Sequence, residues 1–299
     1  MAAAFRKRGF ASSWHAWLLL LCAPALGVAA DEAHHTFWEV KGKHNTVYLL
    51  GSVHMLKPAD STLPPETLQA YAASKGLVME LDLNSLSPDQ LLGESTALAT
   101  LPDGETLAHV LGPQLYAQLQ AVAKTNGFDA DFLEHMQPWF AALMVEQMEL
   151  AKSGFEPGAG VDEQFAQLAQ TDHKPIIALE TLDEQLGIFA HLSLDQQRQY
   201  LRSTLEQSST DASDTQDIVR AWQHGDTATL EQLLREGSSD SPELYRMLTI
   251  DRNRKWLPKL EELLRADDNY LVVVGAMHLI GHGGIVELLR KQGYAAIQH

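Results

Sequence analysis

The feature that most restricts the fold of this chain is a set of short, continuous apolar runs near both ends of the sequence, separated by a long stretch of helical pattern. Short apolar runs bounded by Gly, Pro or polar residues are typical of strands that are buried on both faces. We predict strands at residues 36–41, 46–50, 76–81, 175–179, 271–274 and 294–298, with a hairpin turn at 42–45 joining the first two.

The segments between these runs carry apolar residues at helical spacing. The first and last strands need each other to complete a sheet. The sequence therefore predicts one α/β domain over residues 31–299, with a central mixed sheet built from both chain ends and a large, mostly helical insertion. The predicted helices are 88–100, 113–124, 131–152, 161–170, 195–206, 215–222, 227–236, 242–265 and 284–291, with a kink or a new start at Pro138 and an interruption at Pro258.

Composition excludes several classes of protein. The 299 residues carry a net charge of −17, and 45% of them are apolar, which is ordinary for a globular protein. The single cysteine rules out a disulfide scaffold and a zinc site built on Cys-x-x-Cys. The strong acidity argues against nucleic acid and anionic lipid as partners, because both attract Lys and Arg.

The first 30 residues have the pattern of a secretory signal peptide. Basic residues at 6–8 precede an apolar stretch at 16–28, and Val28-Ala29-Ala30 offers the small residues that signal peptidase requires. The apolar stretch is too short to span a bilayer. We expect cleavage after Ala30, no stable membrane insertion, and a periplasmic or secreted protein. Its net charge would be −20, since the segment holds three basic and no acidic residues.

Polar residues follow four of the predicted strands at their C-terminal ends. Gly51-Ser52-Val53-His54 closes the second strand, and Gly275-Ala276-Met277-His278 closes the fifth. Glu80 and Glu180 follow directly on the third and fourth. In open α/β sheets, ligands bind in the crevice beyond the C-terminal ends of the strands. We therefore expect the two motif histidines to converge with Glu80 in one pocket above the sheet.

The chemistry of such a pocket has two interpretations. Two neutral imidazoles and a carboxylate suit a divalent metal ion, and they also suit a general base with an electrostatic stabiliser. Three other residues also have two interpretations each. Asp162 is a helix cap or a site residue, and Glu180 is a site residue or part of a helix N-terminus. Arg252, next to Asn253, lies on a solvated helix face or turns inward, where it would suit a substrate carboxylate or a developing oxyanion.

These residues make the chain similar to the TraB/GumN (TraB/PrgY/GumN) family over about residues 37–297. The family is distantly related to the Tiki metalloproteases, and its fold resembles that of erythromycin esterases and ChaN-like haem-binding proteins, which implies a central sheet with helical additions. The landmarks between the two Gly-x-x-His motifs are Met79-Glu80, Pro138-Trp139, Gly160-Val161-Asp162, Leu179-Glu180-Thr181 with Gln185, and Arg252-Asn253 with Trp256.

The resemblance to Tiki proteases implies specific roles. His54, Glu80 and His278 would be the reactive cluster and the ligands of a divalent metal ion, Mn, Co or Zn. Arg252 would support catalysis, and the residues behind this cluster would be Asp162, Glu180 and Asn253.

The sequence thus favours an exported metal-dependent hydrolase, and within that class a peptidase, acting on a peptide or small-molecule substrate. Two other hypotheses stay open at this point. One is a non-catalytic protein that sequesters a peptide or haem, and the other is a metal-independent esterase with histidine as its base. The sequence defines neither the substrate nor the oligomeric state.

Overall fold

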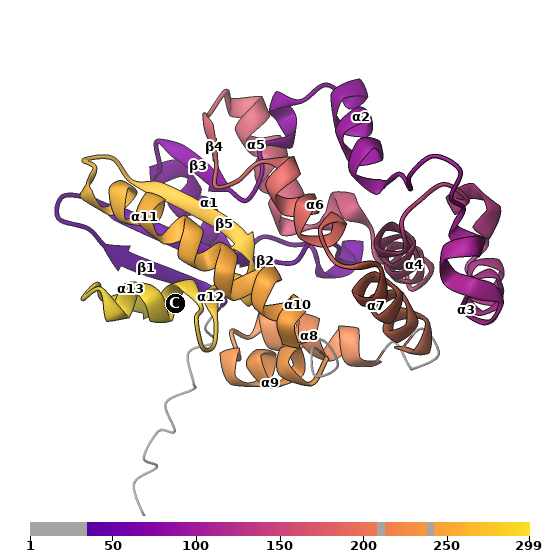
Figure 1. Cartoon of the computed structure of the whole chain (residues 1–299). Coiled ribbons are helices and arrows are strands. Elements are labelled where there is room, and N and C mark those ends of the chain that lie inside the picture. Colours follow the sequence, from indigo (N-terminus) through magenta and orange to yellow (C-terminus); the bar gives the residue numbers. More distant parts are fainter. Residues whose placement is uncertain (1–34, 208–212, 238–241) are drawn as a thin grey trace, which may run out of the picture. The chain divides into compact units, whose positions relative to one another are not determined.

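Six strands of the described residues form one mixed sheet in the order β4-β3-β5-β2-β1-β6. Strands β2, β5, β3 and β4 are mutually parallel, and β1 is antiparallel to both of its neighbours. Figure 1 shows the indigo strand β2, from the start of the chain, beside the yellow β5, from near its end. This confirms the prediction of an α/β fold with a central mixed sheet built from both chain ends. The strands are β1 (Phe37–Lys41), β2 (Thr46–Ser52), β3 (Gly76–Met79), β4 (Ile176–Ala178), β5 (Tyr270–Gly275) and β6 (Ala296–Gln298).

The computed structural model describes residues 35–207, 213–237 and 242–299. The predicted signal peptide, residues 1–30, lies outside the described residues. Among the helices that are described, none combines the length and the apolar character needed to cross a bilayer. The helices are α1 (Pro65–Ala73), α2 (Pro88–Ala99), α3 (Leu107–Thr125), α4 (Pro138–Lys152), α5 (Val161–Asp172), α6 (Leu182–Ala190), α7 (Leu194–Gln207), α8 (Ser213–Gln223), α9 (Thr227–Gly237), α10 (Pro242–Arg246), α11 (Arg252–Arg265), α12 (Ala276–Leu279) and α13 (Ile285–Lys291).

Strand β5 lies between β3 and β2, and its sequence explains that position. Residues 271–274 are Leu followed by three Val, and each is at most 1% exposed. Such β-branched, wholly apolar segments favour a strand that is covered on both faces. Burial of each of these side chains stabilises the fold by about 1.5–3 kcal/mol. Because β2, β3 and β4 run parallel to β5, their C-terminal ends meet at one edge of the sheet.

The two prolines of the helical segments behave differently. Pro138 is the first residue of α4, a position where the missing backbone N–H costs no hydrogen bond. Pro258 lies inside α11 without ending it, so the predicted interruption was wrong. Because proline has no backbone N–H, the carbonyl oxygen of Arg254 lacks its usual helical hydrogen bond. Pro258 and Arg254 are both exposed, so water can bind this oxygen instead.

The helical insertion has an apolar core of its own. Helices α3, α4 and α7 pack together, and this cluster includes Leu119, Leu133 and Leu201, each 0% exposed. Helices α1, α5 and α11 pack on the sheet instead. Residues from α5 and α11 thereby reach the edge where the parallel strands end.

Candidate functional site

The predicted residues meet above Gly275, the last residue of β5. We call the backbone at Gly275 the floor of the site. A Cβ at this position would lie 3.4 Å from Glu80 Oε1, 3.6 Å from His278 Cδ2 and 3.8 Å from His54 Nε2. Any larger residue would therefore fill the space that these three side chains surround. The structure brings together the two motif histidines and the glutamate that the sequence placed in one pocket.

His54 occupies the exposed side of this site. Its side chain is 65% exposed, and its Nδ1 lies 3.0 Å from Asp162 Oδ2. Asp162 reaches it because Gly160 allows the start of α5 to approach closely: a Cβ on Gly160 would be 2.2 Å from the His54 carbonyl oxygen. Asp162 makes no cap hydrogen bond in α5, so the cap interpretation was wrong.

The protonation of His54 reflects its negative surroundings. Loss of hydration opposes a charge on the ring, but the hydrogen bond that His54 donates to Asp162 and the charges of Asp162 and Glu80 outweigh it. The pKa of His54 is raised from 6.5 to about 9 as a result. Because Nδ1–H is directed at Asp162, the ring turns Nε2 toward Gly275. At neutral pH this Nε2 carries a proton, which a metal ion would have to replace in order to bind there.

His278 occupies the buried side and is fixed in one tautomer. Its side chain is 2% exposed, and its Nδ1 lies 2.7 Å from Asn253 Oδ1. The Asn253 amide nitrogen donates to the carbonyls of His278 and Gly283, so its oxygen must be the atom that accepts from Nδ1–H. Burial lowers the pKa of His278 to about 4, and the ring is neutral at pH 7.

Arg252 joins the carboxylates to the buried histidine. Its Nε donates to Glu180, its Nη2 donates to both Glu80 and Glu180, and its Nη1 donates to Leu248 O and to His278 Nε2 at 3.0 and 3.1 Å. All five N–H groups of the guanidinium are therefore used. Arg252 turns inward as one interpretation expected, but it keeps no N–H free for a substrate carboxylate or an oxyanion.

The two carboxylates beside Arg252 differ in their titration. Burial works against the charge on Glu80, but His278, Arg252, His54 and the Gly275 N–H outweigh it and lower the pKa of Glu80 to about 2. Burial raises the pKa of Glu180 despite its contacts with Arg252. Glu180 fits both of its interpretations: it lies in the site, and it directly precedes Thr181, which forms the capping box of α6 with Glu184.

Local helix geometry places Arg252 and Asn253 together. A π-helical segment, Met247–Asp251, directly precedes α11, and π-helical turns within α-helices occur often at functional sites. It lies immediately before the two residues that bind His278. The hydrophobic pattern of residues 242–265 predicted one helix and did not reveal this segment.

Two further side chains complete the site, and they were quoted for the family resemblance but not predicted as site residues. Gln185 Nε2 donates to both Glu80 and Glu180 at 3.0 Å, and Trp256 Nε1 donates to Glu180 at 3.2 Å. The Trp256 ring also packs on His278 with 4.5 Å between centroids. Their spacing from predicted site residues could have indicated them. Trp256 lies one helical turn beyond Arg252, and Gln185 lies five residues after Glu180.

The residues fit a divalent ion in kind and in charge. Glu80 is ionised, and His278 carries a lone pair on Nε2. The formal charges of Glu80, Asp162, Glu180 and Arg252 sum to −2, and to −1 when the proton on His54 is included. Among the described residues, however, no three His, Cys, Asp or Glu side chains are arranged as a metal-binding group. His278 Nε2 accepts a hydrogen bond from Arg252, which it would have to give up to become the third ligand.

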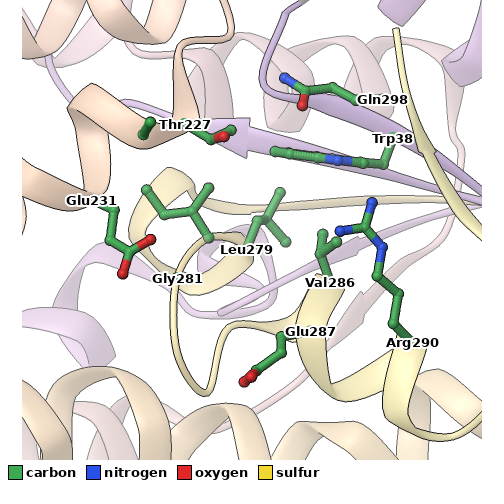
Figure 2. Close-up of a pocket in the computed structure, with 11 residues that line it drawn as sticks. Trp38, Thr227, Glu231, Leu279, Gly281, Val286, Glu287, Arg290 and Gln298 are labelled. Atoms are coloured by element: carbon green, nitrogen blue, oxygen red, sulfur yellow. The ribbon is translucent and has the colours of Figure 1, made fainter.

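A separate cavity lies beside Leu279, Ile280 and Gly281, which follow His278 in the chain. It has a volume of about 350 Å³, and its lining includes Leu279, Glu231 and Arg290, which Figure 2 shows around it. None of the seven predicted site residues lines this cavity. The candidate site is therefore the polar cluster above Gly275.

Fold and site together define an α/β protein in which histidines and carboxylates meet at the C-terminal ends of parallel strands. The chain matches the TraB/PrgY/gumN family over residues 36–298, and it belongs to that family. The resemblance drawn from the motifs is thus confirmed.

The relatives include bacterial and animal proteins. The uncharacterized protein YbaP of Escherichia coli (strain K12) is 28% identical over 243 residues, which cover 81% of this chain and 87% of YbaP. Metalloprotease TIKI2 of Danio rerio is 24% identical over 93% of this chain, and metalloprotease TIKI1 of Homo sapiens is 23% identical over 88%. The matches cover 66% and 62% of these two proteases. No solved structure matches the chain.

Proposed function

We propose that this protein is an exported, metal-dependent hydrolase of the peptidase class. The observation that carries the proposal is the meeting of His54 Nε2, Glu80 Oε1 and His278 around the Gly275 floor. Its relationship to proteins named metalloproteases supports a hydrolase of this kind. Export rests on the sequence of residues 1–30 and predicts a mature N-terminus at Asp31. N-terminal sequencing tests it, and an intact Met1 on exported protein would contradict it.

The metal ion would be held by His54, Glu80 and His278. When bound, it would supply Lewis acidity toward the scissile carbonyl and toward water. Asp162 and Asn253 fix each histidine with Nδ1–H directed outward, so that both rings turn Nε2 inward. To bind the ion, His278 Nε2 would exchange its hydrogen bond from Arg252 for the metal. Arg252 and Gln185 hold the Glu80 carboxylate in place over the floor.

The test uses untagged mature protein that has been stripped with a chelator. An internally quenched peptide library is added, with Mn²⁺, Co²⁺ or Zn²⁺ returned one at a time. We expect cleavage only after a metal is returned, and we expect none from His54→Ala with any of the three. Stoichiometric peptide or hemin binding without cleavage would instead favour the sequestering protein.

The hydrogen bond from Arg252 to His278 favours a second candidate function, a metal-independent hydrolase. In this reaction the His54–Asp162 pair would act as the general base, since Asp162 orients the ring as the carboxylate of a catalytic dyad does. Peptide or ester cleavage that survives complete removal of metal would favour this candidate over the first.

A further inference from the structure

Ser52 lies beside the floor of the site. It is the last residue of β2, and the strand register pairs it with Gly275 of β5. Side chains of directly paired residues project from the same face of a sheet. The Ser52 side chain therefore lies on the face where a Gly275 side chain would meet Glu80, His278 and His54.

The hydroxyl of Ser52 is buried without a partner. Ser52 is 3% exposed, and its Oγ has no hydrogen bond within the part of the chain that the structure describes. Buried hydroxyl groups are almost always paired, because an unpaired one costs stability. Two other buried hydroxyls near the sheet follow that rule: Thr36 Oγ1 donates to Gly51 O, and Ser74 Oγ donates to Ala70 O at 2.7 Å.

The surroundings of Ser52 define what could pair with it. Glu80 presents carboxylate oxygen toward Gly275, and all five N–H groups of Arg252 are already used. The net negative charge of the site disfavours an anionic substrate group. A neutral acceptor such as a carbonyl oxygen therefore meets an uncommitted donor in the Ser52 hydroxyl.

We propose that Ser52 Oγ forms a carbonyl-binding subsite, in which it donates a hydrogen bond to the uncharged amide carbonyl of the substrate above Gly275. This proposal rests on the proposed hydrolase function. It assigns the second residue of the first Gly-x-x-His motif to substrate binding. It also explains why the Ser52 hydroxyl is buried without a partner among the described residues.

The matched pair Ser52→Ala and Ser74→Ala tests this role. Both remove a buried serine hydroxyl, but Ser74 precedes β3 at the opposite edge of the sheet and its hydroxyl is paired. We expect Ser52→Ala to lower kcat/KM on a cleaved library peptide by about 10²-fold, mainly through kcat, because such donors act most strongly in the transition state. Its melting temperature should equal or exceed that of the wild type. Ser74→Ala should melt lower and keep its kcat/KM.

A binding measurement separates this inference from the proposed function. Titration with N-acetyl-alanine methylamide should shift the backbone amide NMR signals of Ser52 and Gly275, and Ser52→Ala should weaken that binding. If the wild type cleaves no peptide but the shifts occur, the hydrolase proposal fails and the subsite stands.

Three results would overturn the subsite. One is unchanged kcat/KM or unchanged amide binding in Ser52→Ala. Another is a loss of melting temperature in Ser52→Ala as large as that in Ser74→Ala, which would mean that the hydroxyl has a structural partner. The third is an acyl adduct on Ser52 in denaturing mass spectrometry, which would make the hydroxyl a nucleophile.

Discussion

The two Gly-x-x-His motifs are alike in sequence and opposite in environment. His54 is mostly exposed, bound to a carboxylate and charged at neutral pH, whereas His278 is buried, bound to an amide and an arginine, and neutral. Both rings nevertheless direct Nδ1–H away from the site. The comparison shows that one motif can place imidazoles in different protonation states, because the state depends on partners from distant segments.

The difference also divides the work between stability and chemistry. The buried half is a closed network in which His278 accepts from Arg252, and Arg252 pairs two buried carboxylates. The exposed half is a single pair, His54 with Asp162. Damage to the buried half should therefore lower the stability of the protein as well as its activity, and damage to the exposed half should affect activity alone.

The largest effect is expected when the buried network loses its cation. Arg252→Ala leaves Glu80 and Glu180 buried without a countercharge, which should cost about 3–5 kcal/mol of unfolding free energy. Arg254→Ala is the matched control, because Arg254 is exposed and its ion pair with Asp251 lies at the surface. It should change stability by less than about 0.5 kcal/mol. Urea denaturation measures both, and equal midpoints for the two variants would contradict the network.

The same substitution at the two histidines sharpens the comparison. His278→Ala leaves Arg252 and Asn253 with unpaired buried groups and should cost about 2–4 kcal/mol, whereas His54→Ala should cost less than about 0.5 kcal/mol. Both should lower peptide cleavage by at least about 10²-fold. Thermal unfolding and peptide assays distinguish the two effects. Similar stability in both variants would show that the halves of the site are not different.

Sequence alone gives much of the fold because its strongest signals are local. The Leu-Val-Val-Val run of β5 predicts a strand, and residues 42–45 predict a turn, each from only a few residues. The short helices α1 and α6 were not predicted, because nine residues give little periodicity to recognise. Pro258 was misjudged because solvent exposure of its neighbours, which a local pattern does not contain, decides whether a helix tolerates it.

The site could be predicted only as far as strand ends indicate it. Parallel strands bring their C-terminal residues together, so the positions of His54, Glu80, Glu180 and His278 follow from the pattern. The roles of Arg252 and Ser52 do not follow, because they depend on whether every donor and acceptor has a partner in three dimensions. Hydrogen-bond saturation is a property of the packed fold.

A smaller effect is expected when His278 loses the hydrogen bond that fixes its tautomer. Asn253→Ala removes the acceptor that holds Nδ1–H of His278. Loss of such a supporting partner lowers metal affinity or activity by about 10–100-fold in metal sites. Calorimetric titration with Mn²⁺, Co²⁺ and Zn²⁺ measures the affinity in the wild type and the variant. Equal affinities would mean that Asn253 does not orient a ligand.

The smallest expected effect is a shift in the pH dependence of peptide cleavage when the His54–Asp162 pair is altered. The raised pKa of His54 keeps Nε2 protonated at neutral pH, so activity that needs its lone pair should increase from pH 7 toward about 9. Asp162→Asn removes the hydrogen bond and charge that raise this pKa, so its rising limb should move down by roughly one pH unit. Peptide-cleavage rates across pH 5–10 test this, and coincident profiles would contradict the pairing.

The most direct test of the account is a pH titration of the two imidazoles by ¹⁵N NMR in the metal-free protein. We expect His278 to remain a neutral Nδ1–H tautomer throughout the range from pH 5.5 to 8, while His54 remains an imidazolium until the pH approaches about 9. Two rings that both lose their proton near their ordinary value of about 6.5 would contradict the claim that one site holds them in opposite states.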